Sequence, residues 1–390
     1  MSTTLILNVG KIITPFDIIE DGVIAINDEG KIMYVGPREE AHFSAREKLE
    51  FPDKIAVPGF IDIHIHGAAG VDTMDGKYES LLKMSKFLVS HGVTAFLPTT
   101  VTSPLEDIFK ALDAIRETRR RGTGYAKILG AHVEGPYFSK EKAGAQDARY
   151  LREPKIEEIK YILNNYGDII VRFTLAPELP NALEAIRYLS GKGILVAMGH
   201  TNAKYEEAIK AINAGAKLAN HMYNGMRGFH HRDPGIIGAV LTRDDVYVEI
   251  IIDEVHHHNA AREIVIRCKG VNRTILITDS IMAAGLPDGE YTLGRQKIII
   301  KNGISRLPDG TIAGSTLTLD RAIKNTVEYL RVPLSDAVRM ATFVPAEVLG
   351  ISYKMGAIKE GYNADITVLN KDLTVAMTLV DGKIVYSASK

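Results

Sequence analysis

The chain has 390 residues, of which 46% are hydrophobic and 24% are charged, with a formal net charge of −1. This length can bury a large core and divide into one large and one small domain, whereas the balanced charge and the lack of a basic block argue against a nucleic acid partner. Residues 1–14 lack the features of a signal peptide and no apolar run is long enough to cross a bilayer, which predicts a cytoplasmic protein without a membrane partner.

Short stretches of β character occupy both ends of the chain. Near the N-terminus they are separated by turn pairs such as Asp21-Gly22 and Glu29-Gly30, and they cannot form a stable domain alone. The predicted strands are residues 5–9, 22–26 and 31–35 near the start and residues 364–369 and 378–386 near the end. We therefore expect one small β-sandwich domain built from residues 1–57 and 357–390 together.

Between the two ends the sequence alternates apolar strands with amphipathic helices. The predicted strands are residues 58–67, 94–98, 128–134, 170–176, 195–200, 218–221, 246–253 and 274–279. The predicted helices between them include residues 78–91, 105–121, 181–189, 205–214 and 260–268. Eight strands with helical crossovers predict an α/β fold, a TIM-like (β/α)8 barrel over residues 58–356.

The segment after the eighth strand departs from this alternation. Residues 285–314 contain two Asp-Gly pairs and the strand-like run Lys297-Ile298-Ile299-Ile300, which predicts a β-hairpin excursion. Helices are predicted at residues 319–330 and 335–349. The single cysteine, Cys268, cannot form an internal disulfide, and we expect it to be a buried helix residue rather than a catalytic thiol.

Histidines and carboxylates gather at the ends of the predicted barrel strands. His64 and His66 alternate in the first strand, so both project to one side and can close on one metal ion. Any one such residue can instead be a satisfied polar group at the rim, but imidazoles and carboxylates at five strand ends predict a hydrolytic metal site. The strand-end residues are His64, His66, His132, Glu134, His200, His221 and Asp279.

These strand-end motifs resemble those of the N-acetylglucosamine-6-phosphate deacetylase family, within the metal-dependent amidohydrolase superfamily. The matching motifs are residues 58–67, His132-Val133-Glu134-Gly135-Pro136, Gly199-His200-Thr201-Asn202-Ala203, residues 221–226, Asp233-Pro234-Gly235 and Thr278-Asp279. The resemblance implies that the chain hydrolyses the acetamide of N-acetylglucosamine 6-phosphate to acetate and glucosamine 6-phosphate.

The resemblance also implies a metal centre. Glu134, His200 and His221 are expected to hold a principal divalent ion, and Asp279 is expected to be the catalytic acid/base. His64 and His66 permit a second site, shared with Glu134 and Asp279, so that one or two ions of zinc or iron are expected. Residues 171–176 supply no lysine of the kind that bridges two metals in many amidohydrolases, and Glu134 takes that place.

The same family implies a set of substrate contacts. Gln146 stands where some members have a histidine near the acetyl carbonyl, and Asn224, Gly225, Arg232 and His256 are expected to bind the sugar phosphate. Because phosphate contacts in these deacetylases include groups from a neighbouring subunit, a homodimer is expected. His230, His231, His257 and His258 match no family site and are expected to be loop residues.

Two other functions stay open at this stage. One is a different barrel amidohydrolase, such as a cyclic-amide hydrolase or a deaminase that acts on a heterocycle. The other is a non-enzymatic assembly protein of amidohydrolase-like fold that has lost its ligands. The intact set of Glu134, His200, His221 and Asp279 argues against the second.

Overall fold

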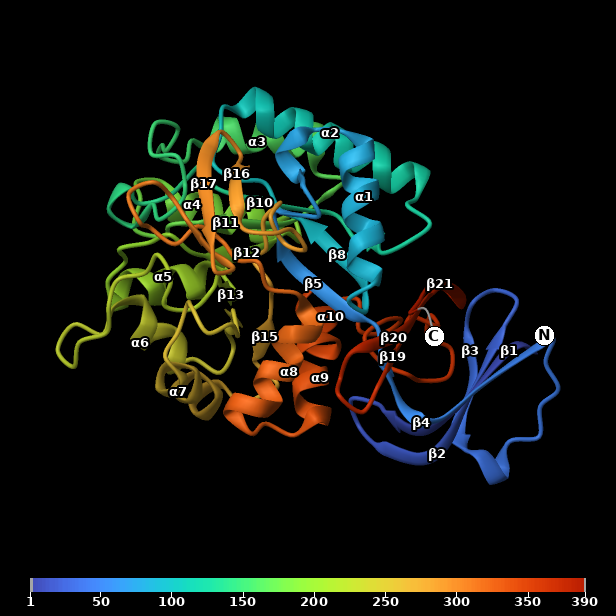
Figure 1. Ribbon diagram of the computed structural model, residues 1–390. Coiled ribbons are helices and arrows are strands. Elements are labelled where there is room, and N and C mark those ends of the chain that lie inside the picture. Colours follow the sequence, from blue (N-terminus) through green and yellow to red (C-terminus); the bar gives the residue numbers. More distant parts are fainter. Residues whose placement is uncertain (1–2, 389–390) are drawn as a thin grey trace.

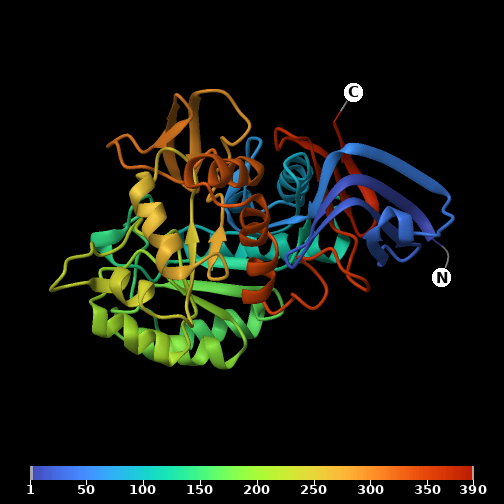
Figure 2. The same cartoon turned by 90° about the horizontal axis from the view of Figure 1, so that it is seen from below.

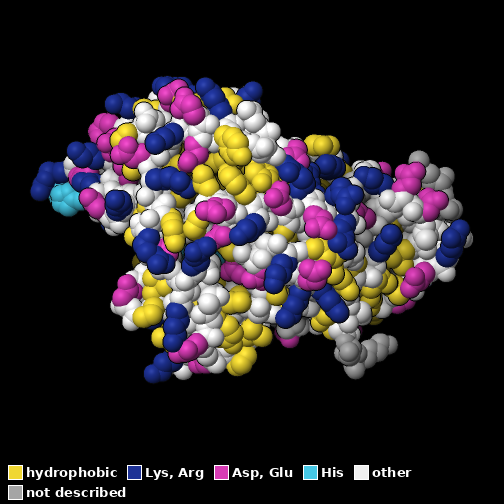
Figure 3. Space-filling model, turned by 90° about the horizontal axis from the view of Figure 1, so that it is seen from above, with side chains coloured by type: hydrophobic (Ala, Val, Ile, Leu, Met, Phe, Trp, Pro, Cys, Tyr) yellow, Lys and Arg dark blue, Asp and Glu magenta, His cyan; other side chains and the backbone are white. Residues whose placement is uncertain are grey.

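The computed structural model describes residues 3–388, which form a large α/β part and a smaller β part (Figure 1). In Figure 2 the N-terminal strands (blue) and the C-terminal strands (red) lie together at one end of the molecule. Within the described residues, no helix is both long enough and apolar enough to cross a membrane. On the face seen in Figure 3, basic and acidic side chains are interspersed.

The smaller part is one seven-stranded sheet with the order β21-β20-β19-β4-β1-β2-β3. Its strands are β1 (Thr3–Ile13), β2 (Ile18–Asn27), β3 (Ile32–Pro37), β4 (Glu47–Pro58), β19 (Ile366–Leu369), β20 (Val375–Val380) and β21 (Lys383–Ser387). Leu7 and Ile24 from one end of the sheet share a core with Ile366 and Leu379 from the other. The prediction that strands from both ends of the chain form one small β part with a shared core is therefore confirmed.

The central strand of this sheet, β4, was not predicted. Pro52 interrupts its sequence, and a proline within a run argues against a strand because it cannot donate to the ladder. The structure accommodates Pro52 with a register shift between β1 and β4. Gly10 lies opposite, where an added Cβ would stand 2.1 Å from the Pro52 carbonyl oxygen, so only glycine fits.

The larger part is the predicted barrel. Two parallel sheets, β5-β8-β9 and β10-β11-β12-β13-β14-β15, are joined by single bridges between Thr99 and His132 and between Ile65 and Ser280. The strands are β5 (Phe60–Ile65), β8 (Val93–Pro98), β9 (Lys127–Ile128), β10 (Ala131–Glu134), β11 (Ile170–Leu175), β12 (Leu195–Met198), β13 (Leu218–Ala219), β14 (Tyr247–Ile250) and β15 (Thr274–Leu276). The predicted third strand is thus split into β9 and β10.

Helices follow most of these strands and cover the outside of the barrel (Figure 1). They are α1 (Tyr78–Val89), α2 (Leu105–Arg121), α3 (Ile156–Tyr166), α4 (Ala182–Gly191), α5 (Tyr205–Ala214), α6 (Gly235–Leu241), α7 (Asn259–Lys269), α8 (Leu319–Leu330), α9 (Leu334–Ala341) and α10 (Phe343–Val348). The prediction of one helix over residues 335–349 was wrong, because the chain leaves helical geometry at Thr342. Pro345 has no N–H to donate to the Ala341 carbonyl, so a continuous helix would lose a hydrogen bond there.

The expectation that Cys268 is buried was also wrong. Helix α7 buries Arg262, Val265 and Lys269, which lie along one face. Cys268 points away from that face and is exposed.

The predicted excursion after the eighth strand is a three-stranded antiparallel sheet, which we call the rim sheet. It comprises β16 (Gly289–Leu293), β17 (Gln296–Lys301) and β18 (Ile304–Arg306). Ile298 and Ile300 of β17 pack in one cluster with Val101 and Ile281 from loops at the carboxyl ends of barrel strands. The rim sheet therefore covers the end of the barrel where parallel strands carry their chemistry.

Candidate metal centre and active site

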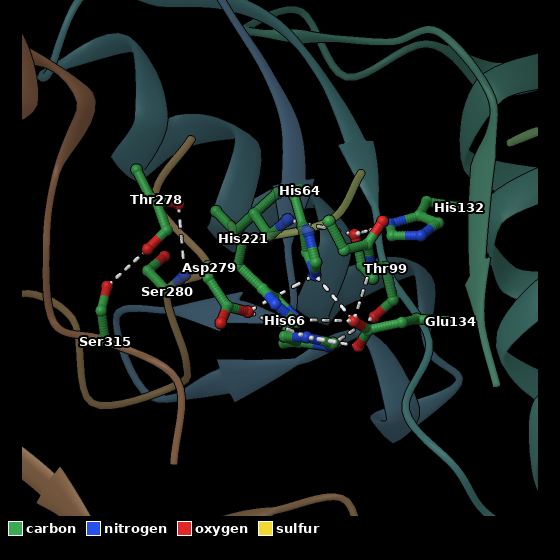
Figure 4. Close-up of polar contacts among 12 residues, drawn as sticks. His64, His66, Thr99, His132, Glu134, His221, Thr278, Asp279, Ser280 and Ser315 are labelled. Atoms are coloured by element: carbon green, nitrogen blue, oxygen red, sulfur yellow. Dashed lines mark hydrogen bonds and ion pairs between the residues drawn. The ribbon is translucent and has the colours of Figure 1, made fainter. Parts of the chain in front are cut away.

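Six of the seven strand-end residues converge on one point, and His64, His66, Glu134, His221 and Asp279 are labelled there in Figure 4. His132 is turned away from them, with its ring nitrogens 3.2 Å from Thr99 Oγ1 and 2.7 Å from Thr174 Oγ1. His64 lies in β5 and His66 just beyond it, Glu134 ends β10, and His200, His221 and Asp279 follow β12, β13 and β15 by two or three residues. All six side chains belong to residues that are at most 8% exposed. A barrel brings these strand ends together although they are more than 200 residues apart in sequence.

Glu134 lies at the centre of this group. Its Oε1 is 3.3 Å from His221 Nε2, 3.4 Å from His64 Nε2 and 3.6 Å from His200 Nε2. Its Oε2 is 3.3 Å from His66 Nε2. Asp279 closes the other side, since its Oδ1 is 3.2 Å from His66 Nε2 and 3.5 Å from His64 Nε2.

Three of the imidazoles are oriented by hydrogen bonds to their other ring nitrogen. His64 Nδ1 lies 3.0 Å from Glu249 Oε2, His66 Nδ1 3.2 Å from the Thr99 carbonyl, and His200 Nδ1 3.0 Å from the Lys142 carbonyl. Because each of these partners only accepts, each Nδ1 carries the proton. In the neutral imidazole, Nε2 is therefore the nitrogen that can bind a cation placed among the carboxylates.

This donor set fits a divalent metal ion. In the described part of the chain His64 Nε2 is buried without a hydrogen-bond partner, and the atoms around it are carboxylate oxygens that carry lone pairs of their own. Burial alone would lower the pKa of His64, but the charges of Glu134 and Glu249 raise it to about 9. Such a cluster needs a cation at its centre, and imidazole and carboxylate ligands suit zinc or iron.

The ligand atoms form two overlapping triads. His64, His66 and Asp279 make one, His64, Glu134 and His221 make the other, and within each triad the ligand atoms lie within 4.8 Å of one another. His64 is common to both. His200 belongs to neither triad, although its Nε2 also faces Glu134.

A buried polar network below the ligands was missed from the sequence. Arg172 of β11 forms an ion pair with Glu249 of β14, and both residues are fully buried. Arg172 Nη2 donates to Asn220 Oδ1 at 2.6 Å, and Asn220 Nδ2 donates to Glu134 Oε1 at 3.0 Å. The sequence contained one sign of this ion pair, a single charged residue in each of two mostly apolar strands. A charge buried in a barrel needs a partner of opposite charge.

A cavity of about 400 Å³ opens from the metal centre toward the rim sheet. Asp279, Glu134, His66 and His200 line its inner part, and the rim sheet and the loop that follows it supply Leu293, Arg306 and residues 310–312. Of the predicted substrate-binding residues, Gln146, Asn224, Gly225 and His256 also line the cavity.

The amide of Gln146 is already engaged with the protein. Its Oε1 accepts from the Thr102 N–H at 2.8 Å and its Nε2 donates to Glu134 Oε2 at 2.9 Å. Gln146 therefore orients a predicted metal ligand. This contact was not anticipated from the sequence, which pointed only to the substrate.

The loop after β13 places Asn224 and Gly225 on the cavity wall. Asn224 Nδ2 is directed at the His221 and Met222 carbonyls, both at 3.2 Å, and at His257 Nε2 at 2.9 Å. The backbone N–H of Gly225 has no partner among the described residues. His257 is in a loop, as predicted, but it is buried against Asn224, and burial lowers the pKa of His257 to about 4.

Arg232 is the predicted substrate contact that the structure does not bring to the cavity of its own chain. It lies in an exposed loop with His230 and His231, and its Nη1 is 2.8 Å from His231 Nε2. It is absent from the cavity wall. Its predicted role therefore requires a second copy of the chain.

Comparison with known proteins agrees with this geometry. Residues 55–385 match the amidohydrolase family. The N-acetylglucosamine-6-phosphate deacetylase of Vibrio furnissii is 40% identical over 95% of this chain and 92% of its own, and the N-acetylgalactosamine-6-phosphate deacetylase of Escherichia coli O157:H7 is 39% identical over 85% and 88%. The structure of the Mycobacterium smegmatis N-acetyl-D-glucosamine-6-phosphate deacetylase, solved in complex with N-acetyl-D-glucosamine-6-phosphate, superimposes with a TM-score of 0.93 at 31% identity, covering 99% of this chain and 100% of that one. The chain belongs to the amidohydrolase family and, within it, to the N-acetylglucosamine-6-phosphate deacetylases.

Proposed function

We propose that this chain hydrolyses the acetamide of N-acetylglucosamine 6-phosphate, releasing acetate and glucosamine 6-phosphate. The observation that carries the proposal is the position of Asp279. Its carboxylate lies 3.2 Å from His66 Nε2 at the metal centre and also lines the cavity that admits the substrate. A carboxylate in that place can exchange protons with both the attacking water and the departing amine.

Asp279 is proposed to act first as the base and then as the acid. Burial would raise the pKa of Asp279, but the neighbouring imidazoles, His64 first, lower it to about 2, so the group is an ionised base at neutral pH. Asp279 accepts the proton of the water that attacks the acetyl carbon and then delivers it to the amine nitrogen as the C–N bond breaks. An amine leaves readily only when it is protonated, so one residue serves both steps.

Glu134, His200 and His221 are proposed to hold a principal zinc or iron ion, with His64, His66, Glu134 and Asp279 as a second site. A bound ion supplies a Lewis acid that polarises the amide carbonyl and favours ionisation of water. Gln146 and Asn220 hold Glu134 in place through the hydrogen bonds described above.

The substrate phosphate is proposed to bind toward the mouth of the cavity. The free Gly225 N–H and His256 are there to receive it, and His256 is held by Asp253, with 2.7 Å between Nδ1 and Oδ2. Asn224 supports that loop, and Arg232 of a second copy is proposed to complete the phosphate contacts in a homodimer. A phosphorylated sugar does not cross a bilayer unaided, which supports a cytoplasmic enzyme.

A direct assay tests the proposal. We expect the metal-loaded protein to release acetate from N-acetylglucosamine 6-phosphate, and a chelator to abolish this activity until zinc or iron is returned. Parallel reactions with the galactosamine epimer, a cyclic ureide and adenosine cover the related deacetylase and the alternative amidohydrolase functions. Hydrolysis of the ureide or deamination of adenosine, without acetate release from either sugar phosphate, would contradict the proposal.

A further inference from the structure

We propose that Arg306 of the rim sheet is a specificity-determining residue that binds the phosphate of the substrate within the same chain. This inference rests on the proposed deacetylase function, because it assigns the phosphate a contact that neither the sequence motifs nor Arg232 supplies. The side chain comes from β18, outside all the strand-end motifs that identify the family.

The charge of Arg306 distinguishes it from the rest of the cavity wall. It is the one lysine or arginine among the described residues that line the cavity. Its Nη1 donates to the Gly310 carbonyl at 2.7 Å, and within the described chain no carboxylate lies within ion-pair distance of its guanidinium. The remaining N–H groups of this planar fork are therefore available to an anion, and phosphate oxygens match their geometry.

Contacts on two sides hold the rim sheet in place, so the position of Arg306 is defined. The Ser315 N–H donates to the Asp279 carbonyl at 2.8 Å and the Ala313 N–H donates to the Ser305 carbonyl at 3.2 Å, which ties β18 to the end of strand β15. On the other side, Gln296 donates to the Ala145 carbonyl, and Arg295 Nη2 is 2.7 Å from Asp107 Oδ2. A contact made from a fixed element loses little entropy when the substrate binds.

The distribution of charge along the cavity suits a substrate with two different ends. Glu134 and Asp279 are buried at its inner end, whereas Arg306 is exposed at its mouth. A phosphate held by the guanidinium at the mouth leaves the other end of the sugar, with its acetamide, to reach the metal centre at the inner end. Binding energy from this remote group then positions the reacting carbonyl.

The test compares phosphorylated and unphosphorylated N-acetylglucosamine on Arg306→Gln and Arg306→Lys. We expect Arg306→Gln to lower kcat/KM for the sugar phosphate by about ten- to a hundredfold, the loss typical of a charge-assisted contact, and to leave the unphosphorylated sugar unchanged. Arg306→Lys should recover part of the loss because it keeps the charge. Lys297→Gln is the matched control, since it removes a positive charge from the same sheet outside the cavity, where Lys297 pairs with Glu290 at 2.8 Å.

Calorimetric titration with glucose 6-phosphate, which has no acetamide, separates this inference from the proposed function. We expect its affinity to fall in Arg306→Gln and to be retained in Lys297→Gln, whether or not the wild-type protein deacetylates any sugar. Equal losses for both sugars would show that Arg306 only supports the fold of the rim sheet. Unchanged kinetics and unchanged affinity for glucose 6-phosphate would show that the phosphate is bound elsewhere, and either result overturns the inference.

Discussion

At the scale of single residues, two predicted functional groups have an unusual backbone. His200 and Asp279 have φ of 46° and 48°, in the left-handed region that residues other than glycine rarely adopt. Asp279 is held there from both sides, because its N–H donates to the His64 carbonyl at 2.9 Å and its carbonyl accepts from the Ser315 N–H. Such strain costs on the order of 1–3 kcal/mol and persists where the surroundings enforce it, often at functional sites.

This geometry makes Asp279→Asn an informative substitution. Asparagine tolerates the left-handed region, so the fold and most metal binding should survive. The amide cannot accept the proton of water, and we expect kcat to fall by about two to four orders of magnitude. Acetate release, measured with the melting temperature and metal content, checks this; more than about a tenth of wild-type activity would remove Asp279 from the role of base.

Metal analysis of histidine variants distinguishes the two triads. His66 belongs to only one triad, so His66→Ala should lose the ion of that site and keep the ion bound by Glu134 and His221. His221→Ala should lose the principal ion and all activity. We expect elemental mass spectrometry to show these separate losses, with His230→Ala in the exposed loop as the control that loses neither.

Equal metal loss in His66→Ala and His221→Ala would instead indicate one inseparable two-metal centre. His64→Ala is not diagnostic here, because His64 contributes to both triads.

The sequence predicted which histidines and carboxylates lie together, but not the direction of each polar side chain around them. Histidines and carboxylates at strand ends can be read from strand periodicity. The amide of Gln146 can contact a substrate or Glu134, and His257 can be exposed or buried against Asn224. Which of these occurs depends on partners far away in the chain. Local patterns carry no such information.

At the scale of secondary-structure elements, the barrel strands carry a buried ion pair beneath the metal centre. Arg172 and Glu249 come from β11 and β14, two strands whose other residues are mostly apolar. Burial would raise the pKa of Glu249, but Arg172 and His64 lower it from 4.5 to about 2. The pair therefore stabilises the fold fully above pH 4.5, and this contribution is lost as the pH falls toward 2.

Glu249→Gln tests the importance of this pair. The substitution leaves the charge of Arg172 buried without compensation, and we expect the free energy of unfolding to fall by about 3–5 kcal/mol. The hydrogen bond to His64 Nδ1 also weakens, which should lower metal affinity by about ten- to a hundredfold. Urea unfolding of the metal-free protein and metal titration measure the two effects separately.

Glu290→Gln is the matched control for this substitution, because it breaks an exposed ion pair with Lys297 and should change stability by less than about 1 kcal/mol. If Glu249→Gln behaves like this control, the buried pair is not a significant source of stability.

Sequence patterns predicted two elements poorly. Strand β4 and the break between α9 and α10 both involve a proline, whose local preference was outweighed in β4 by pairing on both sides and was overlooked in the second case. Strand β4 depends on long-range pairing with β1 and β19, which no local pattern shows, whereas the break after α9 is a local effect of Pro345.

At the scale of the whole molecule, the small sheet and the barrel are joined by charged as well as apolar contacts. Lys127 of β9 lies 2.7 Å from Asp365 and 2.7 Å from Asp381, both from the C-terminal part of the chain. The division into a sandwich and a barrel, with boundaries near residues 57 and 357, remains our proposal. The strands of each end pair mainly with their own sequence neighbours, and β4 joins the two groups by pairing with both β1 and β19.

The predicted role of Arg232, which lies in an exposed loop, is not accounted for by a single chain. Phe229 in the same loop is 61% exposed, although a large apolar side chain on a protruding loop gains nothing from solvent. A sequence can indicate that Arg232 binds phosphate, but it cannot show whose cavity the side chain reaches. We expect light scattering to give a mass twice the 42.8 kDa of one chain.

Mixing two impaired variants tests whether Arg232 acts in the partner's cavity. Arg232→Ala should lower activity toward the sugar phosphate by about ten- to a hundredfold and spare the unphosphorylated sugar, because only the phosphate contact is lost. Asp279→Asn should be inactive toward both. In a mixed dimer, the cavity of the Arg232→Ala chain keeps its own Asp279 and receives an intact Arg232 from the Asp279→Asn chain, so one full site is restored. Activity toward the sugar phosphate should therefore rise above the sum of the separate variants after dissociation and reassociation.

The same mixture without reassociation is the control. No gain on mixing would mean that Arg232 either serves its own chain or does not bind phosphate, and a monomer by light scattering would exclude the shared site altogether.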